Sequence, residues 1–345
     1  MAIYLDKPYV FTPNPTADNG PRIQALMKAG YRWIQINGTE CPIGTTVLLN
    51  REDYWPYSGQ IIEPAPGIEK VTIDASGVGR NPVEPNDPSY AAFDYEGRVL
   101  PASYLTSPAG VNQTQIFVAD TSKYTNGEWI VISDASTNFP VMPLPLDGPM
   151  EVRQVIFVTA NSLILNRVIK RDHPQGAIVA KAIPIQNVYI RNLEFTGNCG
   201  VGVHLHYAQH CVIENITSVD WRGRCMLLLD NGGEYNTIIN SYCTGTEPGI
   251  GPEQNAWGVV VEGQDGTRII NSGGERCGAG QAMNYSIDTV SVNARARLNT
   301  VNVGVYTASI RSGFLRPRTA SPINLDTVIT SDSVDCYMVG QTPLN

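Results

Sequence analysis

Six short segments in the second half of the chain repeat one pattern, an asparagine placed just after an apolar stretch rich in β-branched residues. The segments are 188–195, 211–218, 236–243, 267–274, 296–303 and 321–328. The steps between successive asparagines are 23, 25, 31, 28 and 25 residues, for Asn192, Asn215, Asn240, Asn271, Asn299 and Asn324. Self-similarity at about 20 to 50 residues marks a solenoid, whose units bury their apolar faces only by stacking. The sequence therefore predicts a repeat fold.

The units between these asparagines are too short and too interrupted to hold a helix. Each contains two or three short apolar runs broken by glycine, asparagine or aspartate, as in VGVHLH at 201–206. Such a unit is a coil of short parallel strands, and the crossover rule for parallel strands makes it right-handed. Coils lie about 4.8 Å apart, so an asparagine at one inward turn position can bond its counterpart in the next coil. We expect an all-β, right-handed parallel β-helix with an internal asparagine ladder.

A β-sandwich whose strands end in asparagine is the alternative, because asparagine is a common turn residue. Sandwich strands are joined by short hairpins about 8 to 12 residues apart. The observed spacing of about 25 residues between the asparagines favours the solenoid. The last two units fit less well, because Arg297 and Pro322 replace the isoleucine that stands two residues before the asparagine in the first four.

Charge and hydropathy argue against several functional classes. The net charge of −8 and the pI near 5.1 argue against a nucleic-acid partner, which generally needs a basic patch. No stretch approaches the roughly 18 apolar residues of a transmembrane helix, so no membrane insertion is expected. The N-terminus lacks the features of a secretion signal, so release by lysis is the expected route out of the cell. No cofactor motif is present and no cofactor is expected. The seven cysteines contain no CxxC pair and are expected to be reduced.

The pattern of apolar residues and turns changes along the chain and divides it into three regions. In the first region, Gly20 begins a stretch with helical apolar spacing that ends at Gly30. A helix of about ten residues is expected here, covering the open end of the coils. The second region alternates apolar and polar residues between short turns, which predicts a small antiparallel β-lobe inserted after the first coils. The third holds the main coils. The regions are 1–102, 103–181 and 182–345.

The run at 19–50, NGPRIQALMKAGYRWIQINGTECPIGTTVLLN, resembles the opening of the pectate-lyase-superfamily β-helix domains found in bacteriophage tailspikes. In that family a helix ending in glycine caps the coil and leads into the first strand. The coils from Val188 onward are similar to the family again. The chain lacks the family's aspartates ahead of the helix and its Leu-Pro-Pro-Gly turn, where it has Asn37, Gly38 and Pro42. The resemblance implies the fold and no inherited activity. It also implies a virion or extracellular location, a bacterial surface glycan as partner, and a homotrimer.

A column of titratable residues is expected where three strands end. With a period of two along each strand, His206, Asp230 and Glu262 take the same outward position in consecutive coils. Adjacent coils place such groups about 5 Å apart, and glycoside hydrolysis with retention needs two carboxyls about 5 to 5.5 Å apart. Asp230 and Glu262 are therefore the candidate catalytic pair. His206 is a candidate base or substrate contact.

Further residues beside this column are candidates for substrate binding. Flat aromatic side chains with a polar group suit sugar rings, and an insertion at 246–257 lengthens one coil on this side. The candidates are His204, Tyr207, Trp221, Glu253 and Tyr285. His204, His206 and His210 resemble a metal-ligand set, but the spacing does not place a third ligand beside the first two, so no metal is expected.

Two functional hypotheses follow. The first is a tailspike-like protein that binds and cleaves a bacterial surface polysaccharide with Asp230 and Glu262, as a glycosidase or a lyase. The second is a non-catalytic virion spike, decoration protein or adhesin built on the same β-helix. Incubation with the glycan separates them, because only cleavage yields new reducing ends or an unsaturated product.

Overall fold

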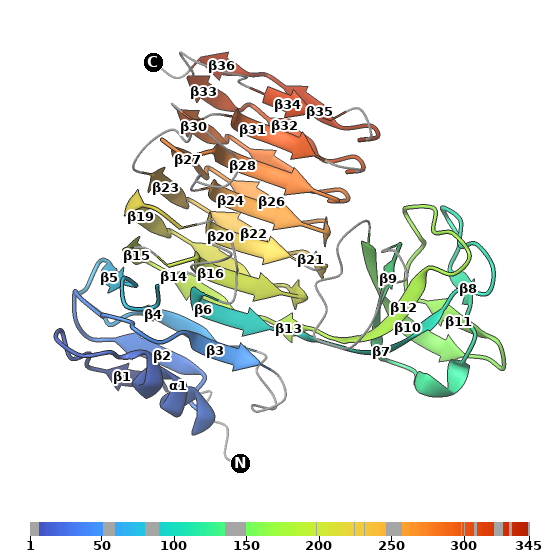
Figure 1. Ribbon diagram of the computed structural model, residues 1–345, viewed down its shortest axis with the longest axis horizontal. Helices are drawn as coiled ribbons and strands as arrows, with labels where there is room; N and C mark the ends of the chain where they lie inside the picture. The colour runs from blue at the N-terminus through green and yellow to red at the C-terminus, as the bar shows by residue number, and fades with distance from the viewer. Residues whose placement is uncertain are drawn as a thin grey trace.

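The computed structural model is a stack of parallel β-coils with a separate β-lobe at its side (Figure 1). The described residues are 7–50, 59–79, 90–134, 150–197, 199–223, 225–230, 232–245, 257–297, 299, 301–306, 309–320, 327–330 and 333–343. Within them, the helices are α1 (Gly20–Lys28) and the 3-10 turn η1 (Thr121–Lys123). None of the helices in these ranges has the length and apolar character needed to span a membrane.

Four parallel sheets run along the stack, and a typical coil of the main stack adds one strand to each. Sheet 1 contains β1 (Tyr9–Phe11), β2 (Trp33–Ile36), β4 (Ile61–Pro64), β14 (Tyr189–Arg191), β18 (Val212–Glu214), β22 (Thr237–Ile239), β26 (Arg268–Ile270), β29 (Val290–Val292), β32 (Gly313–Leu315) and β35 (Tyr337–Val339). Sheet 2 contains β5 (Val71–Asp74), β15 (Leu193–Thr196), β19 (Thr217–Trp221), β23 (Tyr242–Gly245), β27 (Gly273–Glu275), β30 (Arg295–Arg297), β33 (Arg318–Ala320) and β36 (Thr342–Pro343).

The other two sheets carry the strand ends at which the candidate site residues lie. Sheet 3 contains β3 (Val47–Asn50), β6 (Ala91–Glu96), β16 (Val201–His206), β20 (Cys225–Asp230), β24 (Trp257–Glu262), β28 (Ala279–Asn284), β31 (Val301–Tyr306) and β34 (Thr327–Ile329). Sheet 4 contains β13 (Ile185–Gln186), β17 (Ala208–Gln209), β21 (Gly233–Glu234) and β25 (Gln264–Asp265). The expected right-handed parallel β-helix is confirmed.

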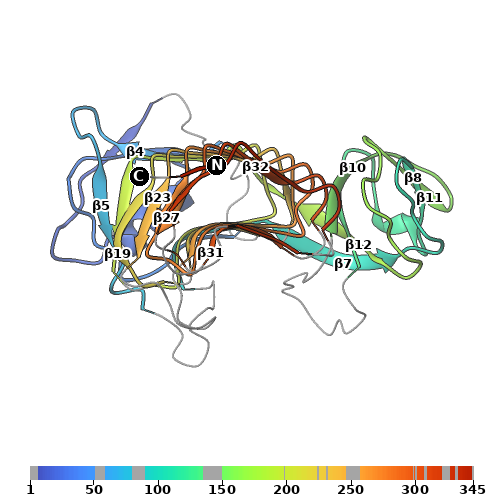
Figure 2. The same ribbon diagram turned by 90° about the horizontal axis from the view of Figure 1, so that it is seen from above.

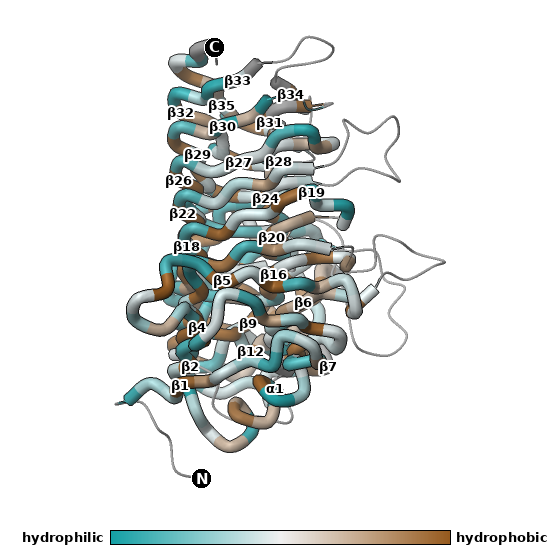
Figure 3. The backbone as a smooth tube through the Cα atoms, turned by 90° about the vertical axis from the view of Figure 1, so that its left-hand side faces the viewer, coloured by the Kyte–Doolittle hydropathy of each residue, from teal (hydrophilic) through white to brown (hydrophobic). Residues whose placement is uncertain are grey.

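The core lies inside the coils because the parallel register stacks like residues on one another. Ile190, Ile213, Ile238 and Ile269 pair in succession along sheet 1, and each is at most 1% exposed. The residues that flank them in these strands are half-buried to exposed and many are polar, and apolar and polar segments alternate along the coils in Figure 3. Burying such a column removes apolar surface from water in every coil, which is the main force that holds the stack together.

The asparagine ladder exists and runs along the bend between sheets 1 and 2. Asn215 donates its side-chain amide to Asn192 Oδ1 at 2.8 Å, and Asn271 donates to Asn240 Oδ1 at 3.1 Å. All four adopt left-handed backbone conformations, with φ between 51° and 58°. Asparagine tolerates this region better than other residues with a side chain, which explains why it recurs at the bend.

Two details of the predicted ladder are wrong. The asparagines are half-buried to exposed rather than internal, because the left-handed turn directs the side chains along the outer edge of the bend. Asn299 does not belong to the ladder, since it is buried and accepts a bond from Cys277 N. Asn293 takes its place, with φ of 53° and a 3.1 Å bond to Asn271. Asn324 lies outside the described residues.

Replacing Asn215 by leucine is expected to lower the free energy of unfolding by about 1–2 kcal/mol. Leucine loses the bond to Asn192 and must adopt a left-handed conformation that its Cβ disfavours. Asn215→Gly is the matched control, because glycine adopts this conformation without strain. Denaturant unfolding of both variants checks this expectation, and a leucine variant as stable as the glycine variant would contradict it.

Helix α1 covers the N-terminal end of the stack, as expected from the sequence (Figure 1). Its buried face carries Ile23 and Met27, which belong to the core of the coils. Asp18 ties the helix start to the loop before β3, because its Oδ1 accepts bonds from the backbone of Gly20 at 2.9 Å and of Gly44 at 2.7 Å. The cap thus shields apolar core that an open coil end would expose.

The lobe is a six-stranded antiparallel sheet with a core of its own. In sheet order its strands are β7 (Arg98–Tyr104), β12 (Ile178–Ile183), β9 (Trp129–Ser133), β10 (Met150–Val158), β11 (Ser162–Leu165) and β8 (Gln115–Phe117). The chain leaves the stack after β6 and returns at β13, so the lobe projects to one side when viewed from above (Figure 2).

A buried ion network joins the lobe to sheet 4. Arg153 of β10 is fully buried and pairs with Glu151 of its own strand and with Asp265 of β25 at 3.2 Å. Arg167 of the lobe pairs with Glu234 of β21, and Lys170 reaches Asp265 at 2.7 Å. Because buried charges are stable only when paired, this network fixes the position of the lobe on the stack.

Candidate functional site

The ends of the sheet 3 strands carry a column of polar residues. In the parallel register His206 pairs with Glu96 on one side and with Asp230 on the other, and Glu262 pairs with Asn284. We call these residues, Glu96, His206, Asp230, Glu262 and Asn284, the strand-end column. The sequence placed His206, Asp230 and Glu262 in this order. Glu96 comes from the first coils, ahead of the lobe, and was not expected.

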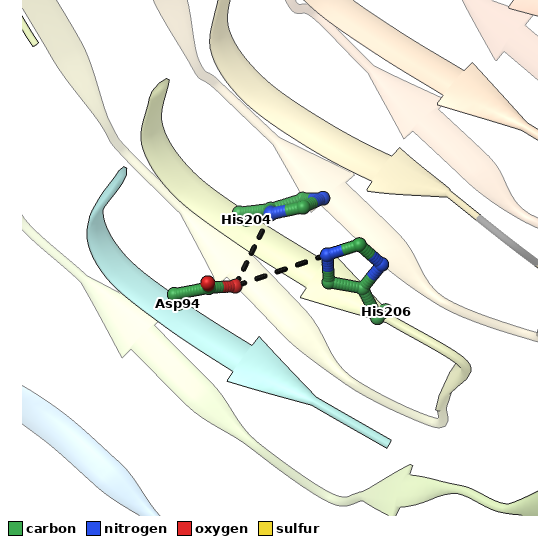
Figure 4. Close-up of side chains that lie close together, drawn as sticks. All are labelled: Asp94, His204 and His206. Carbon is green, nitrogen blue, oxygen red and sulfur yellow. Dashed lines mark ion pairs between the residues drawn. The ribbon is translucent and has the colours of Figure 1, made fainter. Parts of the chain in front are cut away.

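A compact group of two histidines and two aspartates lies at and just behind the strand ends, and Figure 4 draws three of them, Asp94, His204 and His206. His204 and His206 share one face of β16, and their ring centroids are 3.6 Å apart. His204 Nε2 lies 3.0 Å from Asp230 Oδ2, and His206 Nδ1 lies 2.7 Å from Asp230 Oδ1. On the other side, Asp94 Oδ1 lies 3.1 Å from His204 Nδ1 and 3.9 Å from His206 Nε2. We call these four residues the histidine cluster.

Burial and charge shape the protonation of the histidine cluster. Burial of His204, which is 0% exposed, opposes its charged form, but Asp230 and Asp94 outweigh this and raise its pKa to about 10. Burial acts against the charge of Asp230 as well, yet the neighbouring His206 and His204 hold the pKa of this carboxyl well below its usual range. Asp230 is therefore a carboxylate under ordinary conditions and cannot serve as a proton donor.

Glu96 has the opposite electrostatic environment. Burial, and then the nearby charge of Asp94, raise its pKa. A raised pKa favours the protonated form of a carboxyl, which is the form that a general acid needs. Glu96 was missed by sequence reasoning because the whole lobe separates β6 from β16. The only sequence signal is the alternation in AAFDYE, which puts Asp94 and Glu96 on one face of the strand.

Glu262 lies one strand beyond Asp230, since Leu229 pairs with Val261. It is half-buried, and its Oε1 accepts a 2.9 Å bond from Asn284. Asn284, and not the more distant Asp288, occupies the next position of the column. Asp288 instead pairs with Lys170 at 2.7 Å, close to the lobe.

The structure buries several residues that were expected to contact substrate. Trp221 is 0% exposed and packs edge-on against Phe195 inside the coils, so its ring cannot stack on a sugar. Tyr207 is 5% exposed and packs into an apolar cluster with lobe residues. In both cases the aromatic ring supplies apolar area to a core. The surface position proposed from the sequence is wrong for these two.

The remaining substrate-binding candidates are His204, Tyr285 and Glu253. His204 is buried within the histidine cluster and can act on a substrate only through its neighbours. Tyr285 is half-buried, and its carbonyl oxygen accepts a 3.2 Å bond from Arg171 of the lobe. Glu253 and most of the insertion at 246–257 lie outside the described residues.

Among solved structures, the chain is similar to the tailspike gp61 of Pseudomonas phage phi297, with a TM-score of 0.52 and 9% identity. The match covers 86% of this chain and 56% of that tailspike, so the chain spans about half its length. The fold is tailspike-like. A second tailspike, Gp54 of Acinetobacter baumannii bacteriophage AP22 in complex with a capsular saccharide, gives a TM-score of 0.39 at 10% identity over 94% of this chain and 67% of its own.

The sequence comparisons give no relatives. No protein-family model matches the chain, and no curated protein matches it. At 9% identity the likeness to the phi297 tailspike concerns the fold alone. Any function must therefore be argued from the residues of this chain.

Proposed function

We propose that this protein binds a bacterial surface polysaccharide along the ends of the sheet 3 strands and cleaves it there. The observation that carries the proposal is the strand-end column, which gathers three carboxyls and a histidine on adjacent strands of a tailspike-like fold. Sites on a parallel β-stack gain precision because the sheet fixes each side chain at the strand spacing.

The electrostatics support a division of roles within the column. Asp230 is the ionised carboxylate, held so by His204 and His206. Glu262, one strand away at about 5 Å, gives the spacing of a retaining pair. Glu96, two strands from Asp230 at about 10 Å and with a raised pKa, gives a spacing near that of an inverting pair. The anomeric form of the first product distinguishes the two arrangements.

Removing either proposed carboxyl without changing its shape is expected to lower turnover at least about 100-fold. The variants are Asp230→Asn and Glu262→Gln, and the measurement is release of reducing ends, or absorbance of an unsaturated product, from capsular or lipopolysaccharide substrate. Asp220→Asn is the matched control, since Asp220 is an exposed aspartate on sheet 2. A variant that keeps full turnover removes its residue from the mechanism.

A non-catalytic spike, decoration protein or adhesin is the second candidate. It is favoured by the engagement of both Asp230 oxygens with histidines, which is an arrangement that stabilises a structure as well as one that serves catalysis. Retention of the glycan on the wild-type protein without any cleavage would establish this candidate and set aside the first.

Assembly into a homotrimer on a virion is part of the proposal and is supported by the resemblance of the cap and coils to tailspikes. Light scattering at micromolar concentration tests it, because a monomer there would count against both candidates.

A further inference from the structure

The bonds around Asp230 determine which nitrogens of the two histidines are protonated. An ionised carboxylate can only accept hydrogen bonds. The short contacts at its oxygens, 3.0 Å from His204 Nε2 and 2.7 Å from His206 Nδ1, are therefore donated by the imidazoles. The imidazole form that binds a metal is neutral and has a single N–H. When an ion displaces the second proton of His204, the lone pairs lie at His204 Nδ1 and His206 Nε2.

These two lone pairs converge on a third acceptor. Asp94 Oδ1 lies 3.1 Å from His204 Nδ1 and 3.9 Å from His206 Nε2, and dashed lines in Figure 4 mark these two contacts. One ligand atom from each of the three residues lies within 4.8 Å of the other two. When His204 Nδ1 carries no proton, acceptors this close repel one another unless a cation lies between them.

A hydrogen bond between His204 and Asp94 does not satisfy these atoms. Although His204 Nδ1 and Asp94 Oδ1 are close, both atoms are buried and neither has a hydrogen-bond partner of acceptable geometry within the described part of the chain. Buried polar atoms are almost always satisfied, so an unsatisfied pair aimed at one point calls for an unseen partner.

We propose that Asp94, His204 and His206 bind a divalent transition-metal ion, for which Zn²⁺ is the best probe. Zinc–nitrogen and zinc–oxygen bonds of about 2.0–2.2 Å in a tetrahedral arrangement place ligand atoms about 3.3 Å apart. The observed 3.1 and 3.9 Å are close to this spacing. Imidazole ligands favour zinc and its neighbours over Ca²⁺ and Mg²⁺, which prefer oxygen.

The surroundings of the three ligands have the features of a metal site. Asp230 accepts from the far nitrogen of each histidine and so orients both rings, the usual role of a carboxylate behind metal-bound imidazoles. The two carboxylates of the histidine cluster balance the charge of a divalent ion. His206, at 16% side-chain exposure, marks the side from which an ion enters. Three protein ligands leave a fourth position for water or a sugar hydroxyl.

The strand geometry explains how the ligands come together. His204 and His206 are two residues apart on β16 and therefore share a face. Asp94 pairs with His204 across β6 and β16, and Asp230 pairs with His206 across β16 and β20. The ligands thus come from two coils and their orienting group from a third.

The test is a calorimetric titration of chelator-treated protein with Zn²⁺. Wild type is expected to bind one equivalent per chain, and Ca²⁺ and Mg²⁺ are expected not to compete. Asp230→Asn should weaken binding about 10- to 100-fold, because it releases the orientation of both rings. His206→Gln should weaken it further, since it removes a ligand.

His210→Gln is the matched control, because His210 is exposed and stacks on Tyr235 away from the cluster. Unchanged binding in His206→Gln, or no saturable binding by wild type, would overturn the proposal. If the variants misfold, Co²⁺ bound to wild type gives an independent readout, because tetrahedral nitrogen and oxygen ligation produces intense visible bands. Their absence would overturn the proposal as well. The titration contains no glycan, so its outcome is separate from that of the proposed function.

Discussion

Replacing Arg153 by methionine is expected to lower the free energy of unfolding by about 3–5 kcal/mol. The guanidinium is fully buried, pairs with Glu151, and lies 3.2 Å from Asp265 and 3.8 Å from Glu234. It also donates from Nε to the carbonyl of Val168 at 3.0 Å. Methionine fills much of the same space but leaves carboxylates buried with less compensating charge, which is the costly way to break a buried ion pair.

Denaturant unfolding of Arg153→Met measures this loss, and hydrogen exchange of β7 to β12 shows whether the lobe loosens first. Lys123→Met is the control, because the pair of Lys123 with Asp120, at 3.9 Å, is exposed. Removing such a surface pair is expected to cost less than about 1 kcal/mol. Equal stability of the two variants would show that the buried network does not hold the lobe in place.

Raising the pH from 5 to 8 is expected to lower the free energy of unfolding by about 2–3 kcal/mol, because Glu234 holds its proton more tightly in the native state than in the unfolded chain. Burial is the largest influence on this carboxyl and, together with the charge of Asp265, outweighs Arg167 and raises its pKa from 4.5 to about 7. The native state therefore keeps a proton that the unfolded chain has lost. The stability from this proton is complete below about pH 4.5 and is lost as the pH rises through 7.

Glu234→Gln is expected to remove this share of the pH dependence, because glutamine stays neutral throughout. Denaturant unfolding at pH 5 and pH 8, at constant ionic strength, gives the comparison. His173 contributes with the same sign, since Asp134 and Glu151 overcome its burial and raise its pKa. The change of the free energy of unfolding with pH should therefore be smaller in the variant than in wild type, but not zero. If the free energy of unfolding of the variant changed with pH as steeply as that of wild type, a group other than Glu234 would be responsible for the pH dependence.

The histidine cluster and the lobe network pose different problems of charge burial. In the network, Arg153, Arg167 and Lys170 meet carboxylates directly, so the protein itself supplies the opposite charge. In the histidine cluster, Asp94 and Asp230 contact imidazoles, which can be charged or neutral. The second arrangement is the one that a metal ion can complete, and it lies beside the strand-end column.

Some features of this protein follow from the sequence because they repeat. A step near 25 residues forces equivalent residues onto equivalent positions, so the isoleucine column of sheet 1 and the register of His206 with Asp230 follow from the repeat alone. The same argument placed Asn215 on Asn192. The argument failed at Asn299, because the coil after Asn271 is only 22 residues long. The ladder residue of that coil is Asn293, and Asn299 was assigned to the ladder in its place.

The tertiary structure alone decided what the repeat does not encode. Asp94 and Glu96 reach the site from a coil that precedes the lobe, and no sequence period links them to β16. Trp221 and Tyr207 look like sugar contacts in the sequence but are buried, because an aromatic side chain at the end of a strand can turn into a core as readily as toward solvent. Repetition determines register within the stack. Which distant groups share a buried volume depends on how the lobe and the first coils pack, and that is settled only when the chain has folded.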